Sequence, residues 1–263
     1  MVSRIADHPL LRPAAKADPA TRGRSVEGQL VYAIGDIHGS YQPLKALLQR
    51  VVPDATARAH GRCPILIFCG DYVDRGPQSS DVLDALVWLK RRPNFEIHLL
   101  KGNHEQALLA FLEDPEDAEG WLEFGGVATL RSYGVEPPDP RLGPDDCYRA
   151  RDQFLDAMPA AHLRLLERLE LMIGIGDYAF VHAGVRPSRP LDQQHEDDLL
   201  WIRREFLDAT APSHKTIVHG HSWHSDQPEI LPHRIGIDTG AYETGILTAL
   251  RLEDGQVETI QSR

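Results

Sequence analysis

The stretch that decides the fold is ILIFCGDYVDRGP, residues 65–77, in which an apolar run passes directly into charged residues and glycines. A short, β-rich run that stops at a glycine is typical of a strand buried on both faces of a parallel sheet. Asp71, Asp74 and Arg75 follow this predicted strand. Because open α/β sheets bind ligands beyond the carboxyl ends of their strands, the stretch predicts a strand with a polar site at its end.

The segments on either side of this stretch repeat the alternation of strand and helix. Short apolar runs that stop at glycine occupy residues 30–35 and 96–102, and amphipathic runs with helical spacing occupy residues 40–51 and 79–92. The order strand, helix, strand, helix, strand predicts parallel strands joined by right-handed crossovers.

The second half of the chain has a different pattern. After predicted helices at residues 104–113, 120–134 and 161–169, residues 171–184 form two apolar runs folded about Gly176 and Asp177, which is a hairpin signal. Further strands are predicted at residues 216–220, 234–238 and 246–261. Runs of strands without helices between them predict a second, largely antiparallel sheet packed on the first.

The composition limits the possible functions. A chain of 263 residues can bury a sizeable core in one α/β domain. Its formal net charge of -11 argues against sequence-blind binding to nucleic acid or to a membrane. No apolar run reaches the roughly 18 residues that a transmembrane helix needs. The three cysteines form no CxxC pair, which fits a reducing, cytoplasmic setting and excludes a thiolate metal site.

The first 28 residues differ from the rest of the chain. They mix proline, alanine and scattered charges, five basic and three acidic, without helical or strand periodicity. They also lack the continuous apolar core of a signal peptide. Residues 1–28 are therefore predicted to form a flexible N-terminal tail, and residues 29–263 a single catalytic domain.

Side chains that can bind metals follow each of five predicted strands. They are Asp36 and His38 in GDIHG, Asp71 and Asp74 in GDYVDRG, Asn103 and His104 in GNHE, His182 in VHAG, and His221 in VHGHS. Carboxylates gathered at one sheet edge are unstable unless cations lie among them. Oxygen and imidazole donors without thiolate suit Mn, Fe or Zn more than Ca or Mg, and a shared carboxylate gives a two-metal site. This donor set points to hydrolysis of phosphate esters.

The ordered set GDIHG, GDYVDRG, GNHE, HAGV, HGH and DTGA resembles the calcineurin-like metallophosphoesterase superfamily, in particular its bacterial phosphoprotein phosphatase (serine/threonine) branch. The resemblance spans about residues 30–250. It implies an α/β fold in which two packed mixed β-sheets form a sandwich flanked by helices. A dimetal site would lie at the carboxyl ends of the strands.

The resemblance also implies a set of metal ligands. Asp36 and His38 would bind one ion, Asp71 would bridge, and Asn103, His182 and His221 would bind the other. The two divalent ions would be manganese in the first instance, with iron or zinc as alternatives. A hydroxide bridging them would attack phosphorus in line. His219 and His224 flank His221 and are alternative ligands, whereas Asp238 is predicted to shape a loop near the metals through hydrogen bonds and to bind neither ion.

The catalytic and substrate-binding residues are implied in the same way. His104 would act as general acid and protonate the leaving oxygen, oriented by Asp74. Arg75, Arg203 and Asn103 would bind the substrate phosphate, because paired guanidinium groups match its geometry. Arg204 is an immediate alternative to Arg203, which is favoured by the register of LLWIR.

The primary functional hypothesis is a serine/threonine protein phosphatase acting on a phosphoprotein or phosphopeptide, with phosphotyrosine as a further possible substrate. The alternative is symmetrical hydrolysis of dinucleoside polyphosphates such as diadenosine tetraphosphate, or a related phosphodiesterase activity. Bacterial enzymes of that kind tend to have glutamine where this chain has His38. An adenine-stacking surface would favour it, with Trp121, Trp201, Trp223 or Tyr242 as candidates. A scaffold without catalysis would require a broken ligand set, and every position is intact.

Residues 113–150 are predicted to form a cap that faces the substrate.

Overall fold

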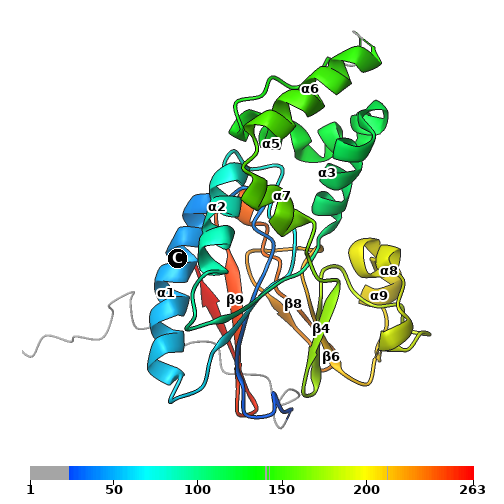
Figure 1. Cartoon of the computed structure of the whole chain (residues 1–263). Helices are drawn as coiled ribbons and strands as arrows, with labels where there is room; N and C mark the ends of the chain where they lie inside the picture. Colours follow the sequence, from blue (N-terminus) through cyan, green and yellow to red (C-terminus); the bar gives the residue numbers. More distant parts are fainter. Residues whose placement is uncertain (1–23, 140, 142, 212) are drawn as a thin grey trace, which may run out of the picture.

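Two five-stranded β-sheets pack face to face, and helices cover their outer faces (Figure 1). The computed structural model describes residues 24–139, 141, 143–211 and 213–263, with the side chains of residues 117–119 left undescribed. The α/β sandwich of two mixed sheets is thus confirmed.

The first sheet has the strand order β10-β9-β1-β2-β3. Its centre is β1 (Leu30–Ile34), β2 (Ile65–Phe68) and β3 (Glu96–Leu99), which pair in parallel as predicted. The helices α1 (Tyr41–Arg58) and α2 (Ser79–Leu89) connect these strands. The antiparallel pair β9 (Thr248–Glu253) and β10 (Gln256–Gln261) completes the sheet beside β1.

The second sheet has the order β4-β5-β6-β8-β7. Its strands are β4 (Met172–Ile175), β5 (Tyr178–Val181), β6 (Thr216–His219), β7 (Glu229–Ile230) and β8 (Arg234–Gly236). The hairpin β4–β5 is confirmed.

Two parts of the predicted strand arrangement were wrong. The second sheet is mixed, not largely antiparallel, because β5, β6 and β8 run parallel. A helical connection with α8 (Glu196–Trp201) and α9 (Arg204–Leu207) lies between β5 and β6 and returns the chain in the same direction. The strands of residues 246–261 join the first sheet, where all six residues of β9 are buried.

The remaining helices form a lobe that rises above the sheets (Figure 1). The lobe contains α3 (Asn103–Glu113), η3 (Pro115–Asp117), α4 (Ala118–Trp121), the π-helical turn η4 (Leu122–Gly126), α5 (Val127–Ser132), α6 (Pro144–Ala157) and α7 (Ala160–Leu166). Two shorter elements lie elsewhere, η6 (Leu191–Gln193) and α10 (Ala241–Thr244).

Successive side chains of a strand point to opposite faces of the sheet, and this alternation builds the apolar layers that hold the sheets together. Val31 and Ile67 of the first sheet meet Phe180 and Val218 of the second in one buried apolar layer. Tyr32 and its neighbours on the other face pack against α1 and α2. A sheet covered on both faces leaves only its ends open, so β1, β2, β3, β5, β6 and β8 can place polar loops at one edge.

The predicted tail, residues 1–28, lies mostly outside the described residues. Of its last five residues, Ser25 donates a backbone hydrogen bond of 2.7 Å to the Asp177 carboxylate, and Val26 is buried between the sheets. Within the described ranges, none of the helices combines the length and apolar character needed to cross a membrane.

Candidate active site

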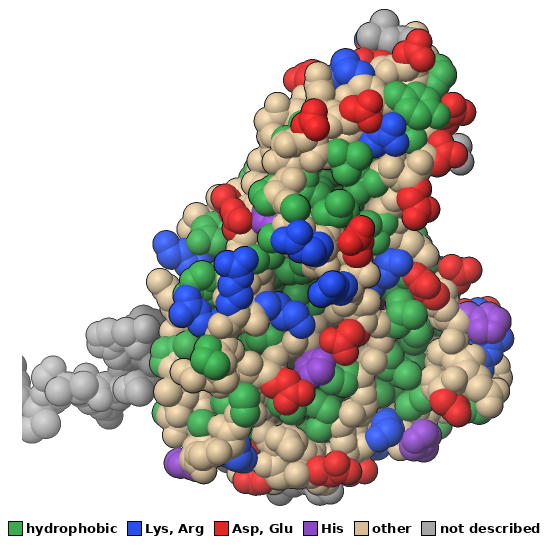
Figure 2. Space-filling model, in the orientation of Figure 1, with side chains coloured by type: hydrophobic (Ala, Val, Ile, Leu, Met, Phe, Trp, Pro, Cys, Tyr) green, Lys and Arg blue, Asp and Glu red, His purple; other side chains and the backbone are tan. Residues whose placement is uncertain are grey.

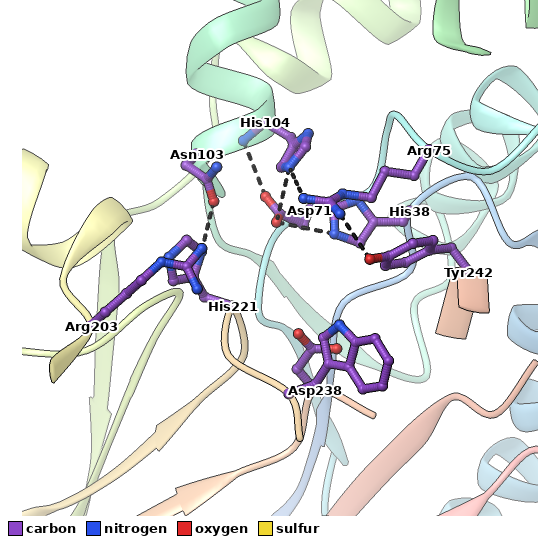
Figure 3. A pocket seen from close by; sticks show the side chains of 10 residues that line it. His38, Asp71, Arg75, Asn103, His104, Arg203, His221, Asp238 and Tyr242 are labelled. Atoms are coloured by element: carbon purple, nitrogen blue, oxygen red, sulfur yellow. Dashed lines mark hydrogen bonds and ion pairs between the residues drawn. The ribbon is translucent and has the colours of Figure 1, made fainter. Parts of the chain in front are cut away.

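A polar cavity of about 260 Å³ opens where the strand ends meet (Figure 3). Its walls come from loops that follow β1, β2, β6 and β8, from the turn between α8 and α9, from the start of α3, and from α10. The lining residues are His38, Asp71, Arg75, Asn103, His104, Arg203, His221, Trp223, Asp238 and Tyr242. Asp36, Asp74 and His182 are buried beside these residues. The structure thus brings together all the candidate site residues.

The loops that carry these side chains have unusual backbone conformations. Of eight described residues other than glycine with positive φ, five belong to the site: His38 (47°), Asp71 (51°), Asp74 (71°), Arg75 (64°) and His221 (62°). Positive φ costs a residue with a Cβ atom free energy, and such residues cluster where the surroundings hold them for function. Here the backbone amide of His38 donates to Asp71 O at 2.8 Å, which ties the β1 and β2 loops together.

Three polar atoms converge on one point between Asn103, His182 and His221. Asn103 Oδ1 lies 2.8 Å from His182 Nε2 and 2.9 Å from His221 Nδ1, and the two ring nitrogens are 3.2 Å apart. His182 Nδ1 donates to Cys69 O at 2.8 Å, which leaves Nε2 with its lone pair. Asn103 Oδ1 and His182 Nε2 are both acceptors and repel one another at 2.8 Å unless a cation lies between them, and metal ligands of about 2.1 Å bond length are spaced in this way.

A second group of donors surrounds the carboxylate of Asp71. Asp71 Oδ2 lies 3.4 Å from His38 Nε2, and Asp71 Oδ1 lies 3.5 Å from His182 Nε2. His38 Nδ1 donates to Val73 O at 3.0 Å, so its Nε2 is also a lone-pair donor. Asp71 belongs to both clusters of potential metal ligands, one with His38 and His104 and one with His182 and His221. One carboxylate therefore faces two sites, which is the arrangement expected of a bridging ligand.

Asp36 lies beside this carboxylate with one oxygen unsatisfied. Its Oδ2 accepts a hydrogen bond of 2.8 Å from the backbone amide of His221, whereas its buried Oδ1 has no hydrogen-bond partner among the described residues. A buried orphan carboxylate oxygen is costly in a folded protein. The donors present therefore fit two divalent ions.

The protonation of the imidazoles agrees with this donor set. Burial lowers the pKa of His38 to about 3 and the pKa of His221 to about 2. Burial also lowers the pKa of His182. These rings are neutral near pH 7, which is the form that binds metals.

His104 lies in the first turn of α3 and reaches from a buried partner to the cavity. Its Nδ1 donates to Asp74 Oδ2 at 2.8 Å, while its Nε2 lies 3.4 Å from Arg75 Nη2 and 4.0 Å from Asp71 Oδ2. Burial by itself would lower the pKa of His104, but Asp71 and Asp74 outweigh burial and raise the pKa. The ring can therefore carry a proton at Nε2, directed at the cavity, while Asp74 fixes its orientation.

Asp74 is itself held by the helical lobe. Thr129 donates to Asp74 Oδ1 at 2.6 Å, and Trp121 Nε1 donates to Asp74 Oδ2 at 3.0 Å. Neither role was predicted from the sequence. The suggestion that Trp121 could stack on adenine was wrong, because the indole is buried between Phe111 and Phe154.

Glu105 is a third residue whose part was not predicted, although it ends the GNHE motif. Its carboxylate accepts backbone hydrogen bonds from Asp71 (2.9 Å), Tyr72 (2.7 Å), Val73 (3.3 Å) and Gly102 (2.9 Å). Glu105 therefore joins the loop after β2 to the loop after β3, which carry Asp71 and Asn103.

Of the two arginines between which the sequence left a choice, one lines the cavity. Arg203 lines the cavity (Figure 3), whereas Arg204 begins α9 and is not among the lining residues. Arg75 Nη1 donates to the hydroxyl of Tyr242 at 2.8 Å, and its guanidinium lies 4.9 Å from the centre of that ring. The two guanidinium groups thus reach the cavity from opposite walls.

The alternatives to His221 lie away from the ligand cluster. His219 is buried against Phe206, with its Nδ1 donating to Gly220 O, and His224 is exposed. Asp238 accepts a hydrogen bond of 2.9 Å from Gly240, in keeping with the predicted loop-shaping part, and it also lines the cavity.

Replacing Gly220 with alanine is expected to weaken metal binding at Asp36. A Cβ atom at position 220 would lie 1.9 Å from Asp36 Oδ1, so the carboxylate must move. We expect metal affinity to fall roughly 10- to 100-fold, as when ligand support is lost. Metal titration followed by calorimetry measures this change. The matched control is Gly174→Ala, whose Cβ would meet only Tyr178 O at 3.9 Å. Unchanged affinity in Gly220→Ala would contradict the assignment of Asp36 as a ligand.

Chelation of metals is expected to make stability fall as pH rises above neutrality. Burial, reinforced by Asp71, raises the pKa of Glu105 to about 8, and burial raises the pKa of Asp238 to about 7. In the unfolded chain both carboxyls are already ionised there, so the folded state binds more protons and loses stability with pH, by on the order of 2 kcal/mol between about pH 7 and 9. Urea unfolding in EDTA measures the loss. Added Mn²⁺ should abolish it, and a loss that persists with Mn²⁺ would contradict metal binding beside these groups.

Known families and proteins that match this sequence indicate the family to which it is related. The family model described as calcineurin-like phosphoesterase matches residues 30–257. Serine/threonine-protein phosphatase 2 of Escherichia coli is 37% identical over 89% of this chain and 100% of that protein. The asymmetrical bis(5'-nucleosyl)-tetraphosphatase PrpE of Bacillus velezensis is 28% identical over 87% of this chain and 91% of that protein.

Two further matches complete the comparison. The symmetrical bis(5'-nucleosyl)-tetraphosphatase of Nitrosospira multiformis is 32% identical over 62% of this chain but only 46% of that protein. Among solved structures, a cold-active protein-tyrosine phosphatase of a Shewanella species superposes with a TM-score of 0.53 at 20% identity, over 94% of this chain and 85% of that chain. At that identity the superposition speaks for the fold alone.

Proposed function

Because this chain belongs to the calcineurin-like phosphoesterase family, whose members hydrolyse phosphate esters at a dinuclear metal site, we propose that it removes phosphate from phosphoserine and phosphothreonine in proteins. The observation that carries the proposal is the position of Asp71. Its two oxygens face His38 Nε2 at 3.4 Å and His182 Nε2 at 3.5 Å. A shared carboxylate between two imidazoles supports a two-metal site for phosphoryl chemistry.

The chain offers a complete set of ligands for two divalent ions. Asp36, His38 and Asp71 would hold one ion, and Asp71, Asn103, His182 and His221 the other. When bound, such ions lower the pKa of water and polarise phosphoryl oxygens. Oxygen and imidazole donors without thiolate favour manganese, with iron or zinc as alternatives.

The other residues act on the phosphate and on the leaving group. Arg75, Arg203 and the Asn103 amide would hold phosphoryl oxygens and stabilise the charge that develops on them. As the bond between phosphorus and the serine oxygen breaks, His104 Nε2 would give its proton to that oxygen. Asp74 keeps the opposite ring nitrogen occupied, so the proton stays on the side facing the substrate.

The size of the cavity supports a macromolecular substrate. Clefts that bury a whole drug-sized ligand measure roughly 300–1,000 Å³. The cavity here measures about 260 Å³ and its lining is largely polar. It suits a phosphoryl group with its nearest atoms, while the rest of the substrate stays outside. We place this activity in the cytoplasm, because Cys63, Cys69 and Cys147 are free thiols.

Hydrolysis of dinucleoside polyphosphates is the second candidate. Trp223 and Tyr242 line the cavity beside Arg75, with ring centres 6.4 Å apart. An aromatic wall next to a phosphate-binding guanidinium could stack a nucleobase. Several relatives carry the name of tetraphosphatases, which supports the same alternative.

The test compares the two substrate classes on one preparation. The metal-stripped protein receives Mn, Fe, Zn or Mg singly, and release of phosphate or nucleotide is measured with a phosphoserine peptide and with diadenosine tetraphosphate. Turnover of the peptide with the dinucleotide untouched is the expected result. Cleavage of the dinucleotide alone would overturn the substrate assignment while retaining the metal chemistry.

A further inference from the structure

We propose that a basic pocket between α2 and α7 is a docking site for a short acidic segment of a partner protein. This α2–α7 pocket has a volume of about 410 Å³ and shares no lining residue with the active-site cavity. Its lining residues are Val87, Lys90, Arg91, Leu99, Ala161, Arg164, Leu165 and Arg168. The inference does not depend on which phosphate ester the active site hydrolyses.

The pocket lies about one helix length from the active site. Ser79, at the start of α2, contacts the backbone of Asp74, whereas Lys90 follows the last residue of the same helix. A helix of 11 residues is roughly 16 Å long. A ligand can therefore occupy the α2–α7 pocket without entering the catalytic cavity.

The pocket concentrates positive charge on an acidic protein. Four of its eight lining residues are lysine or arginine and none is acidic, while the whole chain has a formal net charge of -11. Figure 2 shows a group of basic side chains gathered around an apolar depression over this part of the surface. Like charges gathered against the overall charge of a protein attract a ligand of opposite sign and repel one another without it.

The guanidinium groups of the pocket are not neutralised by other side chains of the described ranges. Arg91, Arg164 and Arg168 form neither a side-chain hydrogen bond nor a salt bridge with any residue of the described ranges. By contrast, Arg186 and Arg189, which are partly exposed elsewhere on the surface, are each paired with Asp198. Lys90 donates to Ile97 O at 2.9 Å, and this bond holds its ammonium group at the rim.

Interaction with helix dipoles accounts for only part of this arrangement. Lys90 and Arg91 follow the carbonyl end of α2, and Arg164 lies in the last turn of α7, where positive charge is favourable by about 0.3–1 kcal/mol each. Dipoles explain the sign of these charges at each helix. They do not explain why two helices direct them at one shared depression with an apolar floor.

The floor of the pocket favours a peptide over other polyanions. Val87, Ala161 and Leu165 are half-buried there and Leu99 is buried, so an aliphatic side chain of a ligand would be shielded from water. A peptide that alternates acidic and aliphatic residues satisfies both the floor and the rim. Nucleic acid offers no aliphatic group of this kind.

Acidic residues limit the length of the anion that fits. Asp84 lies one helical turn before Val87 on α2, with its side chain 73% exposed. Glu96 and Glu170 pair with His98 on β3, next to Leu99 of the floor. A long polyanion such as nucleic acid, or an anionic membrane surface, would meet these carboxylates, whereas a segment of a few residues would not.

Binding of a labelled peptide tests the proposal. The probe is a fluorescein-labelled EELEE peptide, and its binding to the full chain is followed by fluorescence anisotropy at low and high salt. The double variant R164E/R168E is expected to lower affinity by at least about tenfold, because it reverses two rim charges. Substitution of the central leucine by serine in the probe is also expected to weaken binding.

The matched control is K45E/R131E, which makes the same change in net charge at two exposed residues outside the pocket. It should leave peptide affinity unchanged, and both variants should turn over an aryl phosphate as the wild type does. Three results would overturn the proposal: equal losses in both variants, equal binding of the leucine and serine probes, or an R164E/R168E effect seen only with anionic vesicles or oligonucleotides.

Discussion

Replacing His104 with asparagine should lower kcat for a phosphoserine peptide by roughly 10²–10⁴-fold, the usual contribution of a general acid. The serine alkoxide is a poor leaving group and needs a proton as the bond to phosphorus breaks. His104 Nε2 is the nitrogen of this ring that faces the cavity, since Nδ1 is bonded to Asp74 at 2.8 Å. Asparagine retains a polar group near Asp74 but cannot donate a proton by acid catalysis.

The leaving group provides the measurement that isolates this role. An aryl phosphate leaves without help from an acid, so its kcat should fall much less than that of the phosphoserine peptide. The descending alkaline side of the pH profile should also disappear in His104→Asn. The matched control is His98→Asn, outside the cavity, which should leave kcat unchanged.

The geometry would also allow His104 to bind a metal, and the variant His104→Asn tests this second role. His104 Nε2 lies 4.0 Å from Asp71 Oδ2, and the ring belongs to a cluster with His38 and Asp71 that could hold a metal. If His104 acts as an acid, His104→Asn keeps its full metal content. Loss of one metal equivalent, with equal losses of kcat for both substrates, would contradict the acid role.

Replacing Asp71 with asparagine should also have a large effect, because one carboxylate serves two sites. Asparagine keeps one oxygen and puts an NH₂ group against the lone pair of either His38 Nε2 or His182 Nε2. Loss of metal-based stabilisation is worth several kcal/mol, so we expect kcat to fall by about 10³-fold or more.

Metal analysis shows whether the fall in kcat of Asp71→Asn results from the loss of bound metal. Asp71→Asn should retain fewer than two equivalents of metal after dialysis, whereas Asp192→Asn, an exposed residue outside the cavity, should match the wild type. Full metal content at wild-type affinity would show that Asp71 does not bridge. Thermal unfolding of both variants without metal distinguishes this result from a loss of folding.

The sequence could predict those parts of the site that depend on local chain order. Asp36, Asp71 and Asn103 each follow an apolar run that ends at glycine, so their place at strand ends could be inferred from the pattern alone. The parallel centre of the first sheet followed from the same alternation. Both inferences depend on segments of fewer than about 20 residues, over which periodicity is informative.

Contacts between distant segments could not be predicted in this way. Thr129 lies 55 residues after Asp74, in a helical run with no recognisable motif, and only the folded lobe brings the two together. The pairing of β9 with β1 is more remote still in sequence, and a strand buried on both faces fits the pattern of either sheet. Glu105 was visible in GNHE, but its four backbone partners depend on two loops whose conformations no pattern specified.

The hydrogen bonds from the lobe to Asp74 have a consequence for protein engineering. In many scaffolds a peripheral helical insertion can be exchanged to change specificity while the catalytic core is left alone. Here Trp121 and Thr129 belong to the helical lobe, yet they fix the carboxylate that orients His104. A chimaera that replaces this region must therefore supply equivalent donors at the same two places. A library that randomises the lobe should keep both positions constant.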